Sequence, residues 1–249
     1  PPNGSLIKER PFRAPHHTIT AKALCGGGTI PGPGEISLAH CGVLFLDELP
    51  EFHRETLEVL RQPLENGSMQ IHRCGYTYDF PAQFMLVGAM NPCPCGFYPD
   101  LSRCHCSYTA VRRYQEKISM PLLDRIDMMI EVSALSYPQW NQTTQEMSSA
   151  QMKKKVERVR EIQKERRKGQ SFLFNSRMGN QELEEYCALG TQEKKLMKKA
   201  FDELKMSARG YTKILKVART IADLEEKEWI QTEHLQEALC YRTGSGIYQ

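Results

Sequence analysis

The chain has 249 residues, which is long enough for one large domain or two smaller ones with a buried core. Charged residues make up 25% of it and the net charge is +3, an ordinary balance that does not by itself require nucleic acid as a partner. The apolar runs are far too short to span a membrane, and nine cysteines in a chain of this size exclude a typical secreted disulfide scaffold and favour reduced thiols or a metal site in the cytoplasm.

The first forty residues are rich in turns, and residues 25–40 (CGGGTIPGPGEISLAH) predict a hairpin or loop that leads into a short helix. Residues 43–47 are a short apolar run, which we expect to be a parallel strand buried on both faces. Asp47 and Glu48 end this run. Because ligands bind at the carboxyl ends of strands in open α/β sheets, this pair suits a hydrated cation and a water nucleophile. The alternative is two solvated charges that open a loop.

A leucine repeat after Pro50 predicts a helix, which Pro63 should kink or shorten and Gly67 should end. Residues 68–80 (SMQIHRCGYTYDF) alternate on either side of a glycine and predict a β-hairpin. A second buried strand is expected at residues 84–90, where it ends in Asn91.

The next loop carries four thiols in a C-x-C-x₈-C-x-C pattern: Cys93, Cys95, Cys104 and Cys106. Zinc takes four sulfurs tetrahedrally, and two short pairs joined by a loop can supply them. The one-residue gap within each pair makes it harder for both sulfurs to reach one metal, so four reduced cysteines remain the alternative.

A helix is expected from about Tyr108 to Ile118, followed by a short helix near Pro121 and a third apolar strand over residues 128–132. Strands that alternate with helices predict an α/β fold with a doubly wound parallel sheet. The polar stretch that follows lacks periodicity, so we place a domain boundary there, between an α/β domain (residues 1–135) and a helical domain (residues 136–249). The amphipathic runs of the second domain predict N-caps at Asn180, Thr191, Ser207 and Thr232.

Several stretches together resemble one family: RPFRAPHHT, PGEISLAHCGVLFLDELPEF, RQPLENG, NPCPCG, PLLDRID and SARGYTKILKVARTIADL. In this order they are similar to the magnesium-chelatase-like AAA+ ATPases of the ComM/YifB type, over most of the chain from Arg10 to Leu224. The resemblance implies a truncated AAA+ parallel-sheet domain followed by an all-helical lid.

The resemblance also implies roles in ATP hydrolysis, with ATP and Mg²⁺ as cofactors, whereas the possible structural Zn²⁺ rests on the cysteine spacing alone. Asp47 matches the Walker B aspartate that holds Mg²⁺, and Glu48 matches the glutamate that activates the attacking water. Asn91 matches sensor 1, which reaches the γ-phosphate or that water. Phosphoryl transfer needs charge neutralisation and a positioned water, which such groups supply.

Two arginines complete the implied site. Arg125 matches the arginine finger, which is presented to the nucleotide of a neighbouring subunit and so implies a homo-hexameric ring. From the residues alone, a simple ion pair of Arg125 with Asp124 or Asp127 is the alternative. Arg209 matches sensor 2. The resemblance leaves open whether this arginine acts on the nucleotide of its own subunit or on that of a neighbouring subunit.

The phosphate-binding G-x-x-x-x-G-K-[ST] motif does not occur in the 249 residues. The resemblance places this motif and the first strand upstream of Pro1. We therefore expect the chain to be the C-terminal part of a longer ATPase, and to bind ATP poorly or not at all alone.

In the helicase-like branch of AAA+ proteins the hairpin at residues 68–80 projects into a central pore, where His72 and Arg73 of each subunit would grip DNA phosphates. An ordinary surface hairpin is the alternative. The implied function is ATP hydrolysis coupled to translocation or branch migration on single-stranded or branched DNA. The rival functions are a magnesium-chelatase motor subunit and a nucleotide-dead module that binds DNA or a partner.

Overall fold

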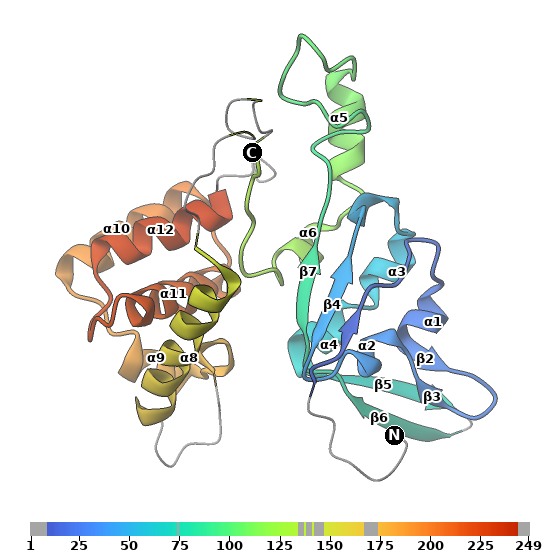
Figure 1. Cartoon of the computed structure of the whole chain (residues 1–249), viewed down its shortest axis with the longest axis horizontal. Helices are drawn as coiled ribbons and strands as arrows, with labels where there is room; N and C mark the ends of the chain where they lie inside the picture. Colours follow the sequence, from blue (N-terminus) through green and yellow to red (C-terminus); the bar gives the residue numbers. More distant parts are fainter. Residues whose placement is uncertain are drawn as a thin grey trace. The chain divides into compact units, whose positions relative to one another are not determined.

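The computed structural model describes residues 9–73, 75–133, 137, 141, 147–166 and 174–243. The chain divides into two compact units, Pro1–Ile126 and Asp127–Gln249 (Figure 1). The domain boundary expected between residues 135 and 136 lies outside the described residues.

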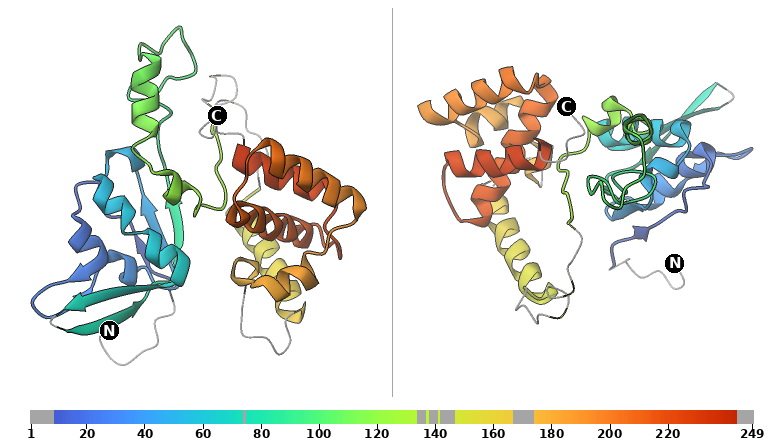
Figure 2. Two further views of the ribbon diagram at one scale, coloured as in Figure 1. Left: turned by 180° about the vertical axis from the view of Figure 1, so that it is seen from behind. Right: turned by 90° about the horizontal axis from the view of Figure 1, so that it is seen from above.

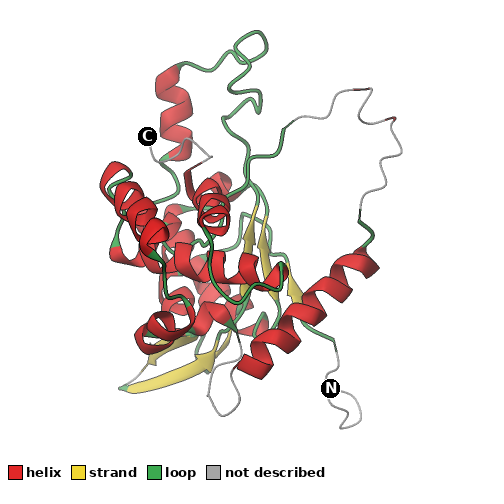
Figure 3. Cartoon of the chain, turned by 90° about the vertical axis from the view of Figure 1, so that its left-hand side faces the viewer, coloured by secondary structure: helices red, strands yellow, loops and turns green. Residues whose placement is uncertain are grey.

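A three-stranded parallel sheet lies in the first unit (Figure 3). Its order is β1 (Phe12–Arg13), β4 (Val43–Leu46) and β7 (Met85–Gly88). The central strand β4 pairs in parallel with both neighbours, with Val43 opposite Phe12 on one side and opposite Met85 on the other. The parallel pairing of the two predicted strands is therefore confirmed.

Strand β4 is fully buried on one face only. Leu44 and Leu46 are inaccessible to solvent, whereas Val43 and Phe45 on the opposite face are half-buried. Phe45 stacks on Phe12 of β1, which is itself exposed. The expectation of burial on both faces is wrong for the described chain, because its side chains cover only one face of these strands.

Residues 128–132, expected to be a third apolar strand, do not form one. Ile130 and Val132 are 67% and 86% exposed, and the Met129 amide donates a hydrogen bond of 2.7 Å to the Tyr241 carbonyl in helix α12 (Thr232–Thr243). A strand needs a neighbouring strand to pair its backbone groups, and no described strand lies beside this run. The third strand of the sheet is β1, which is too short to show a periodic pattern.

Short elements surround the sheet in the predicted order. The hairpin β2 (Gly26–Gly27) and β3 (Gly32–Pro33) joins helices α1 (Ala21–Cys25) and α2 (Glu35–Leu38), as expected for a loop that leads into a helix. The leucine repeat forms two helices, α3 (Arg54–Glu58) and α4 (Arg61–Asn66). The break fits Pro63, whose ring would clash with the carbonyl of Val59 in one continuous helix. Gly67 ends α4 in a left-handed conformation, with φ at 71°.

The predicted β-hairpin is present as the antiparallel strands β5 (Ser68–Arg73) and β6 (Tyr76–Pro81). Figure 1 shows it extending as a two-stranded ribbon below the sheet. Helices α5 (Tyr108–Gln115) and α6 (Met120–Leu123) follow, both within the expected segments. Ser107 and Ser119 cap them by accepting hydrogen bonds from Ala110 and Leu122.

The second unit is helical (Figure 2). Its elements are α8 (Ser149–Arg166), the 3-10 turn η2 (Asn175–Arg177), α9 (Asn180–Tyr186), α10 (Thr191–Glu203), α11 (Ala208–Leu224) and α12. Helix α11 is the most buried and contacts α8, α9, α12 and η2. Ser207 caps α11 as predicted, whereas α9 and α10 have their N-caps one residue earlier than expected, at glycines. No described helix combines the length and the apolar character that a membrane crossing needs.

A buried carboxylate joins three elements of this unit. Asp223 on α11 is inaccessible to solvent. It accepts hydrogen bonds from four side chains: Gln163, Arg166, Asn175 and Arg219. Arg219 is also buried, and it donates to two backbone carbonyls of the loop after α11. The pair is costly to break, because either charge left alone would remain in a low-dielectric interior.

We expect Asp223→Asn to lower the free energy of unfolding of the second unit by about 3–5 kcal/mol, since it leaves Arg219 without its buried counter-ion. Both tryptophans of the sequence fall within residues 127–249, so denaturant unfolding followed by tryptophan fluorescence reports on this unit. The control is Glu226→Gln, which breaks an ion pair with Arg158 that is 56% exposed on both sides and should leave the free energy of unfolding nearly unchanged. Equal losses in the two variants would show that burial of Asp223 does not matter.

Candidate functional site

The carboxylates Asp47 and Glu48 lie at the carboxyl end of β4. The Ala89 amide donates to the Leu46 carbonyl and the Leu49 amide donates to the Ala89 carbonyl, both at 2.9 Å. These two bonds fix the ends of the neighbouring strands side by side. Asp47 and Glu48 are exposed at this edge, so neither charge carries the cost of burial.

Glu48 has a left-handed backbone, with φ at 51° and ψ at 46°. This conformation costs a residue with a side chain about 1–2 kcal/mol. Its amide donates to Oδ1 of Asp47 at 2.9 Å, which holds the two side chains in a defined local geometry. Carboxylate oxygens are the ligands that Mg²⁺ prefers, so an exposed Asp47 beside a second carboxylate fits a hydrated Mg²⁺.

Asn91 follows β7 by three residues and is exposed. Its side chain lies beside the turn at Gly96. A Cβ atom added to Gly96 would lie 3.9 Å from the Asn91 Cγ, which is an ordinary van der Waals contact. Asn91 and the two carboxylates thus follow the ends of adjacent parallel strands. The structure brings these three predicted residues to the same edge of the sheet.

The side chain of His17 contacts Glu48, although the sequence indicated no role for this histidine. Its Nδ1 lies 3.1 Å from Oε2 of Glu48, and its ring packs edge-on against Phe52 at 6.3 Å between centroids. The ring of His16 lies beside it, tilted by 35°, with 4.0 Å between the ring centres. The RPFRAPHHT stretch carried the only signal for His17, and no local pattern links it to a carboxylate that lies 31 residues later.

Tyr114 on α5 lies near the same charges. Burial raises its pKa, and the negative charges of Glu51 and Glu48 raise it further. Lys117 lies 3.5 Å from Glu51 and 5.3 Å from the centre of the Tyr114 ring. The end of α5 and the residues after it therefore contact the turn that follows Glu48 through Glu51, which the sequence pattern did not indicate.

Arg125 follows α6 and is held within its own unit. Its Nη2 lies 2.7 Å from Oε2 of Glu65 on α4, and its Nη1 donates to the Pro121 carbonyl at 2.7 Å. Its side chain is 14% exposed. Glu65 lies 60 residues earlier in the chain, so the sequence pattern did not indicate this partner. The role of Arg125 as an arginine finger stays a prediction.

The other predicted residues lie apart from these groups in the chain. Arg209 is exposed in the first turn of α11 in the second unit, and its sensor 2 role stays a prediction. His72 and Arg73 are exposed at the end of β5, where Nδ1 of His72 lies 2.9 Å from Oγ1 of Thr77 on β6. Cys74, expected near the hinge of this hairpin, lies outside the described residues.

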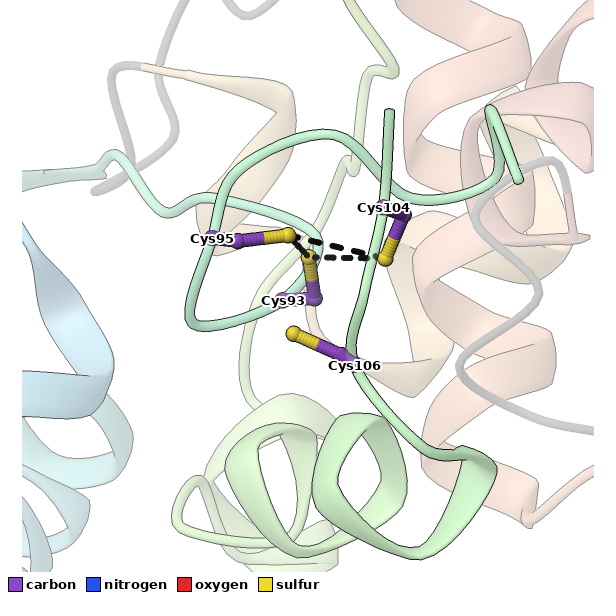
Figure 4. A group of neighbouring side chains, drawn as sticks. All are labelled: Cys93, Cys95, Cys104 and Cys106. Atoms are coloured by element: carbon purple, nitrogen blue, oxygen red, sulfur yellow. Dashed lines mark hydrogen bonds between the residues drawn. The ribbon is translucent and has the colours of Figure 1, made fainter. Parts of the chain in front are cut away.

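The four predicted cysteines converge (Figure 4). All four sulfurs lie within 4.8 Å of one another, and Cys93 and Cys104 are buried. The Phe97 amide donates to Cys95 and lowers the pKa of that thiol to about 6. The cluster has the ligand type and number of a zinc site and could bind zinc.

Comparison with known proteins gives the same family over both units. The family described as magnesium chelatase, subunit ChlI, matches residues 2–140, and the family described as magnesium chelatase, subunit ChlI C-terminal, matches residues 146–242. The chain is 48% identical to the competence protein ComM of Haemophilus influenzae, over 97% of this chain and 47% of that protein. It is 42% identical to the YifB protein of Escherichia coli K12, over 94% of this chain and 46% of that protein. It thus spans about half the length of these relatives.

A weaker similarity exists to the magnesium-chelatase 38 kDa subunit of Acidiphilium rubrum. The two are 31% identical, but over only 28% of this chain and 21% of that protein. The similarity to ComM and YifB therefore covers far more of the chain than the similarity to this chelatase subunit.

Proposed function

The chain belongs to the magnesium chelatase ChlI family, and from this premise we propose that it is the C-terminal part of a ring-forming AAA+ ATPase that couples ATP hydrolysis to DNA translocation or branch migration. One observation carries the proposal. Two exposed carboxylates and an asparagine follow the ends of adjacent parallel strands, in a chain similar to ComM over nearly its whole length.

In this proposal, ATP is the substrate, and a bound Mg²⁺ would neutralise the charge of its phosphates. Asp47 would help to hold that cation. Glu48 accepts a proton from the attacking water, and the amide of Asn91 orients that water or the phosphate. The ring of His17 contacts Oε2 of Glu48 but takes no part in the proton transfer.

In the part of the chain that the structure describes, the sheet has a free edge and an exposed apolar face on which further parts of an AAA+ domain could pack. Strand β7 is an edge strand among the described residues, and Phe12 and Met85 leave apolar surface exposed on the sheet. A parallel sheet is normally covered on both faces. We propose that a phosphate-binding strand and loop, contributed by the part of the protein that ComM and YifB have beyond this chain, complete the sheet.

The proposed DNA contact is the hairpin of β5 and β6. Its exposed end carries Arg73, the imidazole of His72 and the ring of Tyr76, a positive charge beside aromatic surface that suits a nucleic acid backbone and its bases. In a homo-hexamer, six such tips would surround one channel.

The test is the ATPase rate of the full-length protein with single-stranded or forked DNA. We expect DNA to raise the rate, and the DNA concentration for half-maximal stimulation to increase with salt because phosphate contacts release counterions. Arg73→Ala should weaken this stimulation without lowering the DNA-free rate. The matched control is Arg113→Ala, which removes an exposed arginine of α5 in the same unit.

The other outcomes separate the rival functions. ATP hydrolysis without any DNA response, together with stimulation by a chelatase partner protein, would identify a magnesium-chelatase motor subunit. DNA binding without any ATP hydrolysis would identify a nucleotide-dead binding module. Either result would overturn the proposed function.

A further inference from the structure

The loop between Asn91 and α5 has little secondary structure to hold it. Its buried interior consists of Cys93 and Cys104 together with Val111 of α5, and Tyr98 and Cys106 pack against them. The Gln115 side chain donates to the Pro92 carbonyl at 3.1 Å and closes the base of the loop. A core of this size is too small to fix a loop of this length by apolar burial alone.

The sulfur positions match a tetrahedral metal site. Zinc–sulfur bonds of about 2.3 Å in a tetrahedron place neighbouring sulfurs about 3.8 Å apart. The sulfur of Cys93 lies 3.3 Å from that of Cys95 and 3.8 Å from that of Cys104, and the Cys95–Cys104 separation is 3.5 Å. These distances are well beyond a disulfide bond of about 2.05 Å.

The turn at Gly96 explains how cysteines one residue apart reach a common point. Gly96 has a φ of 80°, and its amide donates to the Cys93 carbonyl at 3.0 Å. An extended strand would place the Cys93 and Cys95 side chains on one face but about 6.5 Å apart along the chain, too far for both sulfurs to meet. The turn instead directs both sulfurs inward, so the spacing that argued against a metal is accommodated by the fold (Figure 4).

Backbone amides surround the sulfurs as an outer shell. The Tyr98 amide donates to the Cys93 sulfur at 3.4 Å, and the amides of Phe97 and Cys106 donate to Cys95 and Cys104. Such N–H donors orient metal-bound thiolates and balance their charge. A cluster of four neutral thiols would gain little from this arrangement.

We propose that Cys93, Cys95, Cys104 and Cys106 bind one structural Zn²⁺ ion. Four soft thiolate ligands select zinc over Mg²⁺ and leave no open position for a water or a substrate. The bound ion fixes the loop that connects Asn91 to α5, and so determines where the asparagine at the end of β7 can lie. The site is separate from the nucleotide chemistry, and its occupancy does not depend on ATP hydrolysis.

The test begins with metal analysis of the chain purified without added zinc, where we expect one zinc ion per chain. Cys93→Ser combined with Cys104→Ser should lose the metal. The matched control combines Cys41→Ser with Cys240→Ser, two exposed thiols outside the loop, and should keep it. Retention of zinc by the first variant, or its absence from the unaltered chain, would overturn the proposal.

A second measurement avoids any variant that fails to fold. Chelation of the unaltered chain should expose four additional thiols to a thiol reagent and should speed tryptic cleavage after Arg103, which now packs on the Phe97 ring at 4.1 Å. Cleavage after Arg73 in the β-hairpin should not change. If chelation leaves both thiol reactivity and Arg103 cleavage unaltered, no metal holds this loop.

Discussion

In the full-length protein, Glu48→Gln will lower ATP turnover by at least about 10², the scale of a positioned general base, and will leave nucleotide affinity nearly unchanged. Glutamine keeps the size of the side chain and an oxygen that His17 can contact, but it cannot accept a proton from water. Stopped-flow binding of a fluorescent ATP analogue and steady-state release of phosphate measure the two quantities separately.

Asp47→Asn should show the opposite pattern. It removes one negative charge from the proposed cation site, so the Mg²⁺ concentration needed for nucleotide binding should rise. The Glu48 amide now donates to Oδ1 of Asp47, and asparagine can preserve that bond, so the turn should survive. A loss of affinity in Glu48→Gln as large as that in Asp47→Asn would contradict separate roles for the two carboxylates.

His17→Ala is the matched control, because it tests whether the contact between His17 and Glu48 matters apart from the carboxylate itself. It removes the 3.1 Å contact with Glu48 but keeps the carboxylate. If the chemistry belongs to the carboxylate, this variant should retain most of the turnover. If His17→Ala loses as much as Glu48→Gln, then holding the loop in place matters more than the proton transfer.

Local patterns predicted the elements that depend on neighbours in the sequence. The apolar runs before Asp47 and before Asn91 formed the strands β4 and β7, and the alternating stretch around Gly75 formed the hairpin. Pro63 divided the leucine-rich helix. In each case the signal and its structural effect lie within a few residues, so burial or backbone geometry follows from composition.

The features that the sequence did not predict depend on partners far along the chain. Residues 128–132 have the composition of a strand, yet that composition cannot supply a neighbouring strand. His17 meets Glu48, and Glu65 meets Arg125, across separations that no periodicity spans. The spacing of the cysteines indicated the four members of the cluster, but their convergence depends on the turn at Gly96.

A second large effect is expected at Arg125. In the full-length protein, Arg125→Ala should lower ATP turnover by at least about 10³, because an arginine finger stabilises the charge of the transition state. Nucleotide affinity should fall much less. The assay compares phosphate release with analogue binding at a protein concentration where the ring is shown to be assembled.

Glu65→Gln is the control for the observed ion pair. Arg125 now lies 2.7 Å from Glu65, so Arg125→Ala removes this contact as well as any contact across a subunit boundary. Glu65→Gln removes the same charge pair but keeps the arginine. A finger predicts that Glu65→Gln still hydrolyses ATP, whereas a purely structural role predicts similar losses in both variants.

Mixing the two inactive variants distinguishes action across the boundary from action within one subunit. An active site with the glutamate from an Arg125→Ala subunit and the arginine from a neighbouring Glu48→Gln subunit is intact, and random equal mixing forms it at about a quarter of the interfaces of a cyclic ring. Activity should therefore return in part. If Arg125 acts within its own subunit, no subunit of the mixed ring holds both groups and nothing returns. Mixed rings that demonstrably form and yet stay inactive would therefore rule out the finger role of Arg125.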